Sequence, residues 1–165
     1  MIRKSTQEDV IQIMNLVKQA QAYFKSQGID QWQDGYPNAE QINQDILKQN
    51  SYVLVDGDVI GTMYFAIEDD PTYLHIDGKW KTQDKPYAVI HRIVVDENIK
   101  GQGLAKQLLD YAEAKCLKQR VSSIRIDTHD DNLSMQRFLK KNGFEACGHI
   151  TLESGALRIA FEKVL

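Results

Sequence analysis

This sequence of 165 residues has few cysteines, no long apolar run and a small net charge. No apolar run approaches the roughly 18 residues of a membrane-spanning helix. Cys116 and Cys147 have no CxxC partner, so we expect no metal site and interpret both as buried structural thiols. Two cysteines and no secretory signal favour a reduced, cytoplasmic protein. The net charge of −3 favours neither nucleic acid nor a membrane surface as a partner.

The first half of the chain alternates helix and strand signals. Helical spacing of apolar residues predicts a helix that begins after a capping-box sequence at Thr6–Asp9 and ends before Gly28. Asn38 is suited to cap a short second helix. Two strand-like runs follow, and Asp56-Gly57 between them is typical of an antiparallel hairpin. Residues 68–86 form a long polar connection, which we expect to flank the active site.

The second half continues the alternation. Tyr87 to Val95 is nearly continuously apolar, as expected of a central strand that is covered on both faces. A third helix, a strand ending at Asp127, a fourth helix stopped by Asn142-Gly143 and two closing strands complete the pattern. There are no repeats or low-complexity tracts, so the length and pattern predict a single α/β domain over residues 1–165 with a mixed sheet.

The most informative segment leads from Arg92, through a turn containing Gly101 and Gly103, into the third helix. The first N–H groups of a helix lack intrahelical partners and carry partial positive charge, so small residues there let a pyrophosphate lie on the backbone. The segment lacks both the lysine–serine pair of a P-loop and the third glycine of a dinucleotide-binding turn. On its own it is also compatible with an ordinary strand-to-helix turn.

A second segment, from Asp127 to Phe144, supports the phosphate-binding interpretation. Together the two segments resemble the acetyl-CoA motifs of the GNAT superfamily of N-acetyltransferases. The first is similar to [RQ]-x-x-G-x-[GA] after a strand, and the second to N-x-x-x-x-x-x-Y-x-K-x-G-F beginning at Asn132. The resemblance implies the α/β (α+β) fold of that family, with a mostly antiparallel central sheet flanked by helices. It also implies acetyl-CoA as the cofactor.

The resemblance assigns cofactor-binding roles to both segments. In that family the strand before the glycine-containing turn offers backbone N–H groups to the cofactor. The turn and the helix start, here called the cradle, hold the pyrophosphate. An asparagine of the second motif contacts the cofactor arm, and in this chain it is also suited to cap a helix. The predicted cofactor-binding residues are Ile93, Val94, Val95, Lys100, Gly101, Gln102, Gly103, Leu104, Ala105, Lys106 and Asn132.

Two positions depart from the family pattern. Lys100 replaces the usual Arg or Gln, which keeps a positive charge but loses the fork of donors of an arginine. Leu139 stands where many members have a tyrosine thought to protonate the departing thiolate. Either the hydroxyl of Tyr73, Tyr87 or Tyr111 takes that role, or the thiolate leaves unprotonated, which a thiol pKa of about 8.5 makes feasible.

An amine acceptor must lose a proton before it attacks, because its pKa is about 10.4. Asp127 is the predicted catalytic base, since related protein-acetylating members carry a carboxylate at this strand end. A cap or a substrate-orienting role is the alternative for Asp127. His91 and His129 titrate nearer neutral pH and are second candidates for the base.

The loop from Gly28 to Pro37 places two aromatic residues among polar ones. In related enzymes this region lines the acceptor site, so we predict substrate contacts for Trp32 and Tyr36, together with His91 from the central strand. Cation–π attraction to an amine would suit the aromatic rings. Simple packing is the alternative role for both aromatic residues.

We therefore interpret the chain as an acetyl-CoA-dependent N-acetyltransferase that acts by direct transfer in a ternary complex. The acceptor is a primary amine of a small molecule or a protein N-terminus. A non-catalytic acyl-CoA-binding module is the first alternative, and a binder of nucleotide phosphates is the second. The sequence leaves the identity of the acceptor and the oligomeric state open, a homodimer included.

Overall fold

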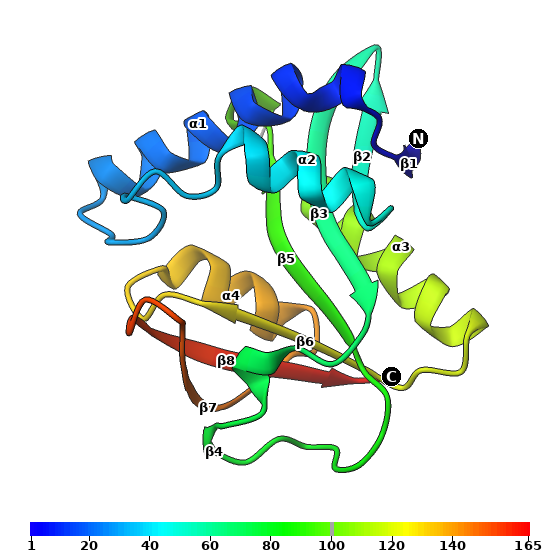
Figure 1. Ribbon diagram of the computed structural model, residues 1–165, viewed down its shortest axis with the longest axis vertical. Helices are drawn as coiled ribbons and strands as arrows, with labels where there is room; N and C mark the ends of the chain where they lie inside the picture. Colours follow the sequence, from blue (N-terminus) through cyan, green and yellow to red (C-terminus); the bar gives the residue numbers. More distant parts are fainter. Residues whose placement is uncertain (100) are drawn as a thin grey trace. The chain divides into compact units, whose positions relative to one another are not determined.

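A computed structural model describes residues 1–99 and 101–165 (Figure 1). The helices are α1 (Val10–Ser26), α2 (Ala39–Leu47), α3 (Leu104–Lys118) and α4 (Leu133–Lys141), with short 3-10 turns η1 (Gln7–Asp9), η2 (Pro71–Tyr73) and η3 (Glu97–Ile99). The strands are β1 (Ile2–Lys4), β2 (Ser51–Asp56), β3 (Asp58–Ile67), β4 (Asp77–Gly78), β5 (Ala88–Val95), β6 (Ser123–Thr128), β7 (Glu145–Thr151) and β8 (Leu157–Val164).

In the described part of the chain the strands form one eight-stranded sheet in the order β1-β2-β3-β5-β6-β8-β7-β4. β5 and β6 run parallel. Antiparallel pairing joins β1 to β2, β2 to β3, β4 to β7, β6 to β8 and β7 to β8. The predicted α/β class with a mixed, mostly antiparallel sheet flanked by helices is therefore confirmed.

The chain divides into two compact units. Unit 1 comprises Met1–Phe65 and His91–Ala112, and unit 2 comprises Ala66–Ile90 and Glu113–Leu165. β5 contributes its first three residues to unit 2 and the rest to unit 1, and α3 is likewise divided.

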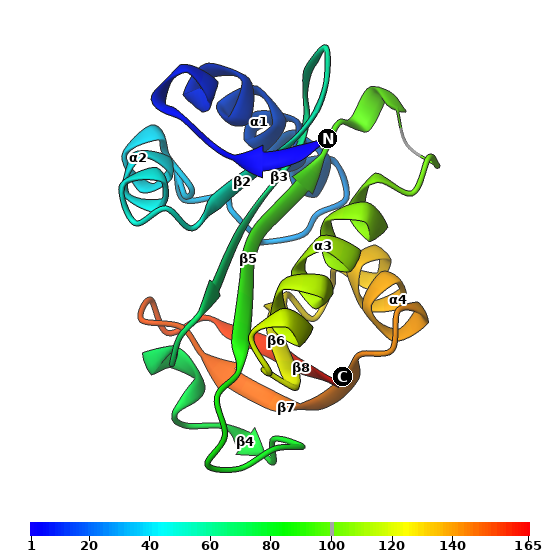
Figure 2. The same ribbon diagram turned by 90° about the vertical axis from the view of Figure 1, so that its right-hand side faces the viewer.

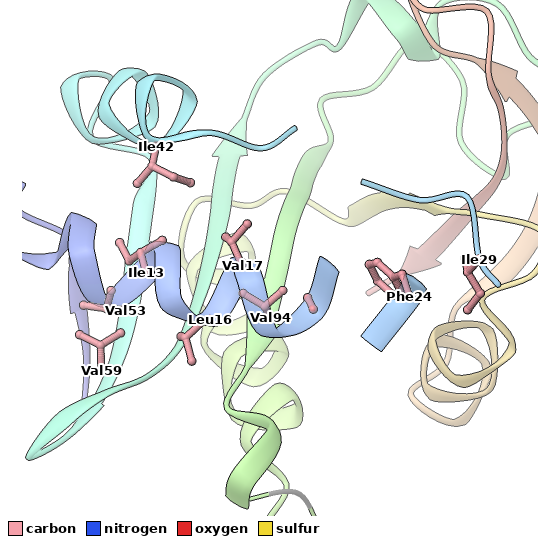
Figure 3. Packing of buried hydrophobic residues seen from close by; sticks show 10 residues of the cluster. Ile13, Leu16, Val17, Phe24, Ile29, Ile42, Val53, Val59 and Val94 are labelled. Carbon is pink, nitrogen blue, oxygen red and sulfur yellow. The ribbon is translucent and has the colours of Figure 1, made fainter. Parts of the chain in front are cut away.

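Unit 1 buries its core between α1, α2 and one face of its strands. Ile13 and Val17 of α1 pack with Ile42 of α2 and with Val53 and Val94 of the sheet (Figure 3). Successive strand residues point to opposite faces, so Leu54 and Val95 face the other way. There a Cβ at Gly61 would lie 3.4 Å from atoms of Leu54, Val95 and the α3 residue Leu108. The start of α3 thus covers the face opposite α1 and α2 (Figure 2).

Local sequence chemistry sets the ends of these elements as predicted. The side chain of Asn38 accepts a hydrogen bond from the N–H of Gln41 at 2.9 Å and caps α2. Gly57, with φ of 75°, turns β2 into β3, and Gly143, with φ of 89°, follows α4. A positive φ costs glycine little, because it has no Cβ.

Unit 2 shows two differences from the sequence interpretation. The polar connection of residues 68–86 contains η2 and the short strand β4, which pairs with β7 through Asp77 with His149 and Gly78 with Gly148. The alternating pattern cannot reveal a strand this short. Cys116 is buried as predicted, and burial raises the pKa of its thiol to about 11. Cys147 is only half-buried, so its prediction as a buried thiol is wrong, because it follows the exposed residues Glu145 and Ala146 at the start of β7.

Candidate active site

The turn before α3 has the geometry that a phosphate cradle needs. Gly101 and Gly103 adopt positive φ angles of 81° and 69°, and a Cβ at either position would meet nothing within 4 Å. The carbonyl of Gly103 accepts the N–H of Gln107 at 3.0 Å, so the helix begins directly after this glycine. The first N–H groups of α3 therefore lie beside two exposed glycines. Lys100 lies outside the described residues.

The other predicted residues of the cradle differ in exposure. Gln102 is exposed, Ala105 is half-buried, and the side chain of Leu104 is buried in the core, which leaves its backbone N–H as its polar group. The ammonium of Lys106 lies 2.7 Å from Asp110 on the helix surface. Two opposite charges in this exposed pair attract each other weakly, so the pair does not fix Lys106 strongly.

The strand before the turn contains an irregularity that its nearly continuous apolar pattern does not reveal. Arg92 has φ of 50°, the left-handed region, in the middle of β5. Such a conformation costs a non-glycine residue about 1–3 kcal/mol and requires compensating contacts. Beyond it the side chains of Ile93 and Val94 are 9% exposed, whereas Val95 is half-buried. Their side chains belong to the core, so a role for them toward the cofactor falls to the backbone.

The guanidinium of Arg92 supplies the compensating contacts. Its Nε and Nη2 donate to the buried carboxylate of Asp45 at 2.7 and 2.8 Å, and its Nη1 donates to the hydroxyl of Tyr36 at 2.6 Å. The guanidinium also lies over the ring of Tyr64, 4.9 Å from its centroid. Arg92 is thus a functional candidate that the sequence analysis missed, because nothing local to it signals a partner so distant in sequence.

All three predicted substrate residues gather around this arginine in unit 1. Tyr36 contacts it directly, and the Trp32 ring packs edge-on against Tyr36 with centroids 6.5 Å apart. The ring of His91 lies 5.8 Å from Tyr64, which itself stacks beneath Arg92. Trp32 packs against the core cluster of unit 1, whereas Tyr36 is 38% exposed. Of the two aromatic residues, Tyr36 therefore offers more surface to a ligand.

Asp127, the predicted base, lies on β6 in unit 2 and is half-buried. Its Oδ2 accepts a hydrogen bond from the hydroxyl of Tyr73 at 2.6 Å. Tyr73 is 2% exposed, and its pKa is raised well above the usual value, first by burial and then by the negative charge of Asp127. The connection of residues 68–86 thus supplies the partner of Asp127.

The remaining predicted residues of unit 2 have defined roles. Asn132 is buried, and its side chain caps α4 by accepting the N–H of Met135 at 3.1 Å. Leu139 is fully buried and packs in the core. The ring of His129 accepts the N–H of Asp131 at 3.0 Å. Among the described residues, the hydroxyl of Thr128 is a buried polar atom without a hydrogen-bond partner.

The structure shows contacts for all three tyrosines considered as replacements for the missing acid. Tyr73 donates to Asp127. Tyr87 accepts the backbone N–H of Asp70 at 2.8 Å. The ring of Tyr111 packs against Tyr52 in unit 1, with centroids 5.5 Å apart.

A buried ionic network fixes the segment that carries Tyr73. Glu162 of β8 is 0% exposed, and its carboxylate accepts hydrogen bonds from Ser123, from Thr82 and from Arg125. Burial raises the pKa of Glu162, but these donors outweigh it and the pKa is lowered. Arg125 lies between two rings, 4.2 Å from the centroid of Trp80 and 3.9 Å from that of Tyr87. The periodic pattern of the sequence does not predict this network, because its members lie far apart in the chain.

The comparisons with known proteins define the class. The sequence matches the acetyltransferase (GNAT) family over residues 15–144. A GNAT-family acetyltransferase from Streptococcus agalactiae is 33% identical, with a TM-score of 0.89, covering 100% of this chain and 95% of that one. The chain therefore belongs to the GNAT acetyltransferase family.

A more distant neighbour shares the fold alone. The PaiA N-acetyltransferase from Thermoplasma acidophilum, solved in complex with coenzyme A, is 18% identical with a TM-score of 0.75 and covers 100% of this chain and 98% of that one. No curated protein matches the sequence.

Family membership makes the protein an N-acetyltransferase and acetyl-CoA its cofactor. The residues present fit that cofactor, because Gly101 and Gly103 leave open space in front of the first turn of α3. A charged pyrophosphate is stabilised by such unpaired N–H groups at a helix start.

Two kinds of feature are absent from residues 1–99 and 101–165. Nowhere in these ranges do three or more His, Cys, Asp or Glu side chains converge to hold a metal ion. None of the helices there combines the length and the apolar character needed to cross a bilayer.

Proposed function

We propose that the protein transfers the acetyl group of acetyl-CoA directly to a primary amine, of a small molecule or of a protein N-terminus, in a ternary complex. The proposal rests on the turn before α3, where Gly101 and Gly103 both face open space. The family match over residues 15–144 crosses both compact units, which supports a single N-acetyltransferase domain over residues 1–165. We further propose a cytoplasmic location, which the low cysteine content favours.

In this proposal the backbone holds the cofactor. The N–H groups from Gln102 to Lys106 receive the pyrophosphate beside Gly101. Lys100, which lies outside the described residues, is proposed to contribute its positive charge. The backbone of Ile93, Val94 and Val95 faces the pantetheine arm, for which no special side chain is required. Asn132 contributes from the start of α4, where its capping bond already fixes its orientation.

Asp127 is the proposed base. The half-buried carboxylate takes a proton from the ammonium form of the acceptor, directly or through a water molecule, and so produces the neutral amine that attacks. When bound, acetyl-CoA would supply an activated acyl carbon: the C–N bond of the amide would form, the C–S bond would break, and the released thiolate would gain, through water, the proton that the amide nitrogen gives up. Leu139 has no proton to give, so the thiolate departs unassisted, as a thiol pKa of about 8.5 permits at modest cost.

Tyr36, Trp32 and His91 form the proposed acceptor side in unit 1. The hydroxyl of Tyr36 is fixed by Arg92, so its exposed ring is held in one place. A fixed aromatic face attracts an amine cation by about 0.5–2 kcal/mol, which is enough to orient a small acceptor.

A thiol-release assay with acetyl-CoA and a panel of polyamines, aminoglycosides, amino acids and peptide N-termini tests the proposal. We expect release that depends on the acceptor, together with an acceptor heavier by one acetyl group in mass spectrometry. Binding of CoA in calorimetry with no transfer to any amine would instead indicate an acyl-CoA-binding module. Stronger binding of ATP than of CoA would indicate a nucleotide binder.

A further inference from the structure

Tyr73 and Asp127 are joined although they are 54 positions apart in the sequence, with 2.6 Å between the phenol oxygen and Oδ2. Asp127 pairs with Ala160 of β8, and Arg125 pairs with Glu162. Because strand side chains alternate, Asp127 and Arg125 share one face of β6. This is the face onto which the connection of residues 68–86 folds, since Arg125 contacts Trp80 there.

Tyr73 is held through its ring, its backbone and the turn that carries it. The indole N–H of Trp80 donates to the carbonyl of Tyr73 at 3.0 Å, and the two rings lie 5.2 Å apart. The turn η2 that carries Tyr73 is capped by Asp70, whose side chain accepts the N–H of Thr72 at 2.9 Å. The backbone N–H of Asp70 donates to the hydroxyl of Tyr87. The phenol therefore reaches Asp127 from a rigid support.

In the hydrogen bond between Tyr73 and Asp127, the phenol is the donor. A carboxylate only accepts, so the phenol proton lies on the bond to Asp127. Burial raises the pKa of Tyr73 well above the usual value, and Asp127, Asp70 and Tyr87 raise it further. The phenol thus stays a neutral donor, and a neutral donor favours the ionised form of its carboxylate partner.

We propose that Tyr73 is a positioning residue for Asp127: its hydroxyl fixes the orientation of the carboxylate and keeps it ionised, ready to take a proton. The inference rests on the proposed role of Asp127 as the base. It also removes Tyr73 from the candidates for protonating the thiolate, because its single proton is committed to Asp127.

The test compares the pH dependence of kcat in Tyr73→Phe and Tyr87→Phe. Each variant loses one phenol oxygen. The oxygen of Tyr87 binds the backbone of Asp70 beside η2, whereas that of Tyr73 binds Asp127, so only Tyr73→Phe loses a bond to Asp127. For Tyr73→Phe we expect kcat to fall about tenfold or more, as for a lost hydrogen bond to a charged group. The acid limb of its profile should move to higher pH, since the carboxylate loses a donor that favours its charged form. The KM for acetyl-CoA should stay within about threefold of wild type.

For Tyr87→Phe we expect a smaller fall in kcat and an unmoved acid limb, because this variant weakens the support of η2 but keeps the bond between Tyr73 and Asp127. An unmoved limb in Tyr73→Phe, or equal losses in both variants, would overturn the inference and leave a structural role for the phenol. Asp127→Asn is measured alongside. If that variant keeps wild-type turnover, the base assignment fails; if it is impaired while Tyr73→Phe is normal, only the positioning role fails.

Incorporation of 3-fluorotyrosine at position 73 covers the case in which Tyr73→Phe does not fold. The fluorine makes the phenol a stronger donor without removing it, so the acid limb should move to lower pH. A limb that does not move, or that moves to higher pH, would overturn the inference.

Discussion

Arg92 and Asp45 form a bidentate ion pair, with Nε 2.7 Å from Oδ2 and Nη2 2.8 Å from Oδ1. The side chain of Asp45 is 3% exposed and that of Arg92 is 11% exposed. The pair joins α2 to the residue of β5 that has a left-handed backbone. It thereby offsets the strain at the start of the segment proposed to face the cofactor.

Replacing Asp45 should therefore destabilise the protein strongly. Asp45→Asn leaves the buried guanidinium without its counter-charge, and loss of one partner of a buried ion pair costs about 3–5 kcal/mol. The free energy of unfolding from urea titrations measures the effect. Asp110→Asn is the control, because it breaks the exposed pair with Lys106 and should cost less than about 1 kcal/mol. Similar losses in the two variants would contradict the argument.

The close backbone approach between the paired strands β4 and β7 predicts a second large effect. A Cβ at Gly148 would lie 2.1 Å from the carbonyl oxygen of Asp77, and Gly148 has φ of 144°. Gly148→Ala should thus cost about 3 kcal/mol or more, because two backbones must separate. Gly155→Ala, with φ of 90° and nothing within 4 Å, carries only the conformational cost of about 1–2 kcal/mol. Equal thermal midpoints of the two variants would disprove the close approach.

The elements that the sequence predicted are those encoded by neighbouring residues. The cap of α2 at Asn38, the hairpin turn at Gly57 and the glycine-led start of α3 each depend on contacts within a few positions. Apolar periodicity likewise gave α1 and the central strand β5, because a buried face repeats with the period of its element.

The parts that escaped prediction depend on polar pairs far apart in the sequence. Arg92 and Asp45 are 47 positions apart, and Thr82 and Glu162 are 80 apart. Such partner residues leave no periodic signal in their own elements, and only the folded chain brings the two together. Tyr73 was named as one hydroxyl among three, and only the structure joins it to Asp127.

The buried Glu162 predicts how stability depends on pH. Its pKa in the folded protein is below the ordinary value of 4.5, so its contribution is fully present above that pH and is lost as the pH falls through the folded pKa. Glu162→Gln should therefore lose less stability than wild type as the pH falls below 4.5. Glu145→Gln, which removes an exposed partner of Lys81, should retain the wild-type slope. A slope in Glu162→Gln as steep as that of wild type would refute the assignment.

The cradle predicts a selective loss of cofactor binding. Gly103→Glu places a side chain and a negative charge where the pyrophosphate is proposed to lie, so CoA should no longer bind detectably in calorimetry. Gly57→Glu is matched to it, because Gly57 also has a positive φ, of 75°, and open space beyond its Cα. The control should bind CoA like wild type. Unchanged CoA affinity in a folded Gly103→Glu protein would show that the cradle lies elsewhere.

The last prediction concerns Asp127 itself, whose carboxylate is fixed by Tyr73. Asp127→Asn keeps the shape of the side chain but removes the proton acceptor, and a general base typically contributes about 10²–10⁴-fold. Turnover at about pH 7 should fall within that range, while the Michaelis constant for acetyl-CoA changes little. Raising the pH should partly restore the variant, because more of the amine then arrives neutral, whereas wild type gains less. Turnover within about threefold of wild type corresponds to less than about 1 kcal/mol of barrier, and the proton would then pass to His91, His129 or water.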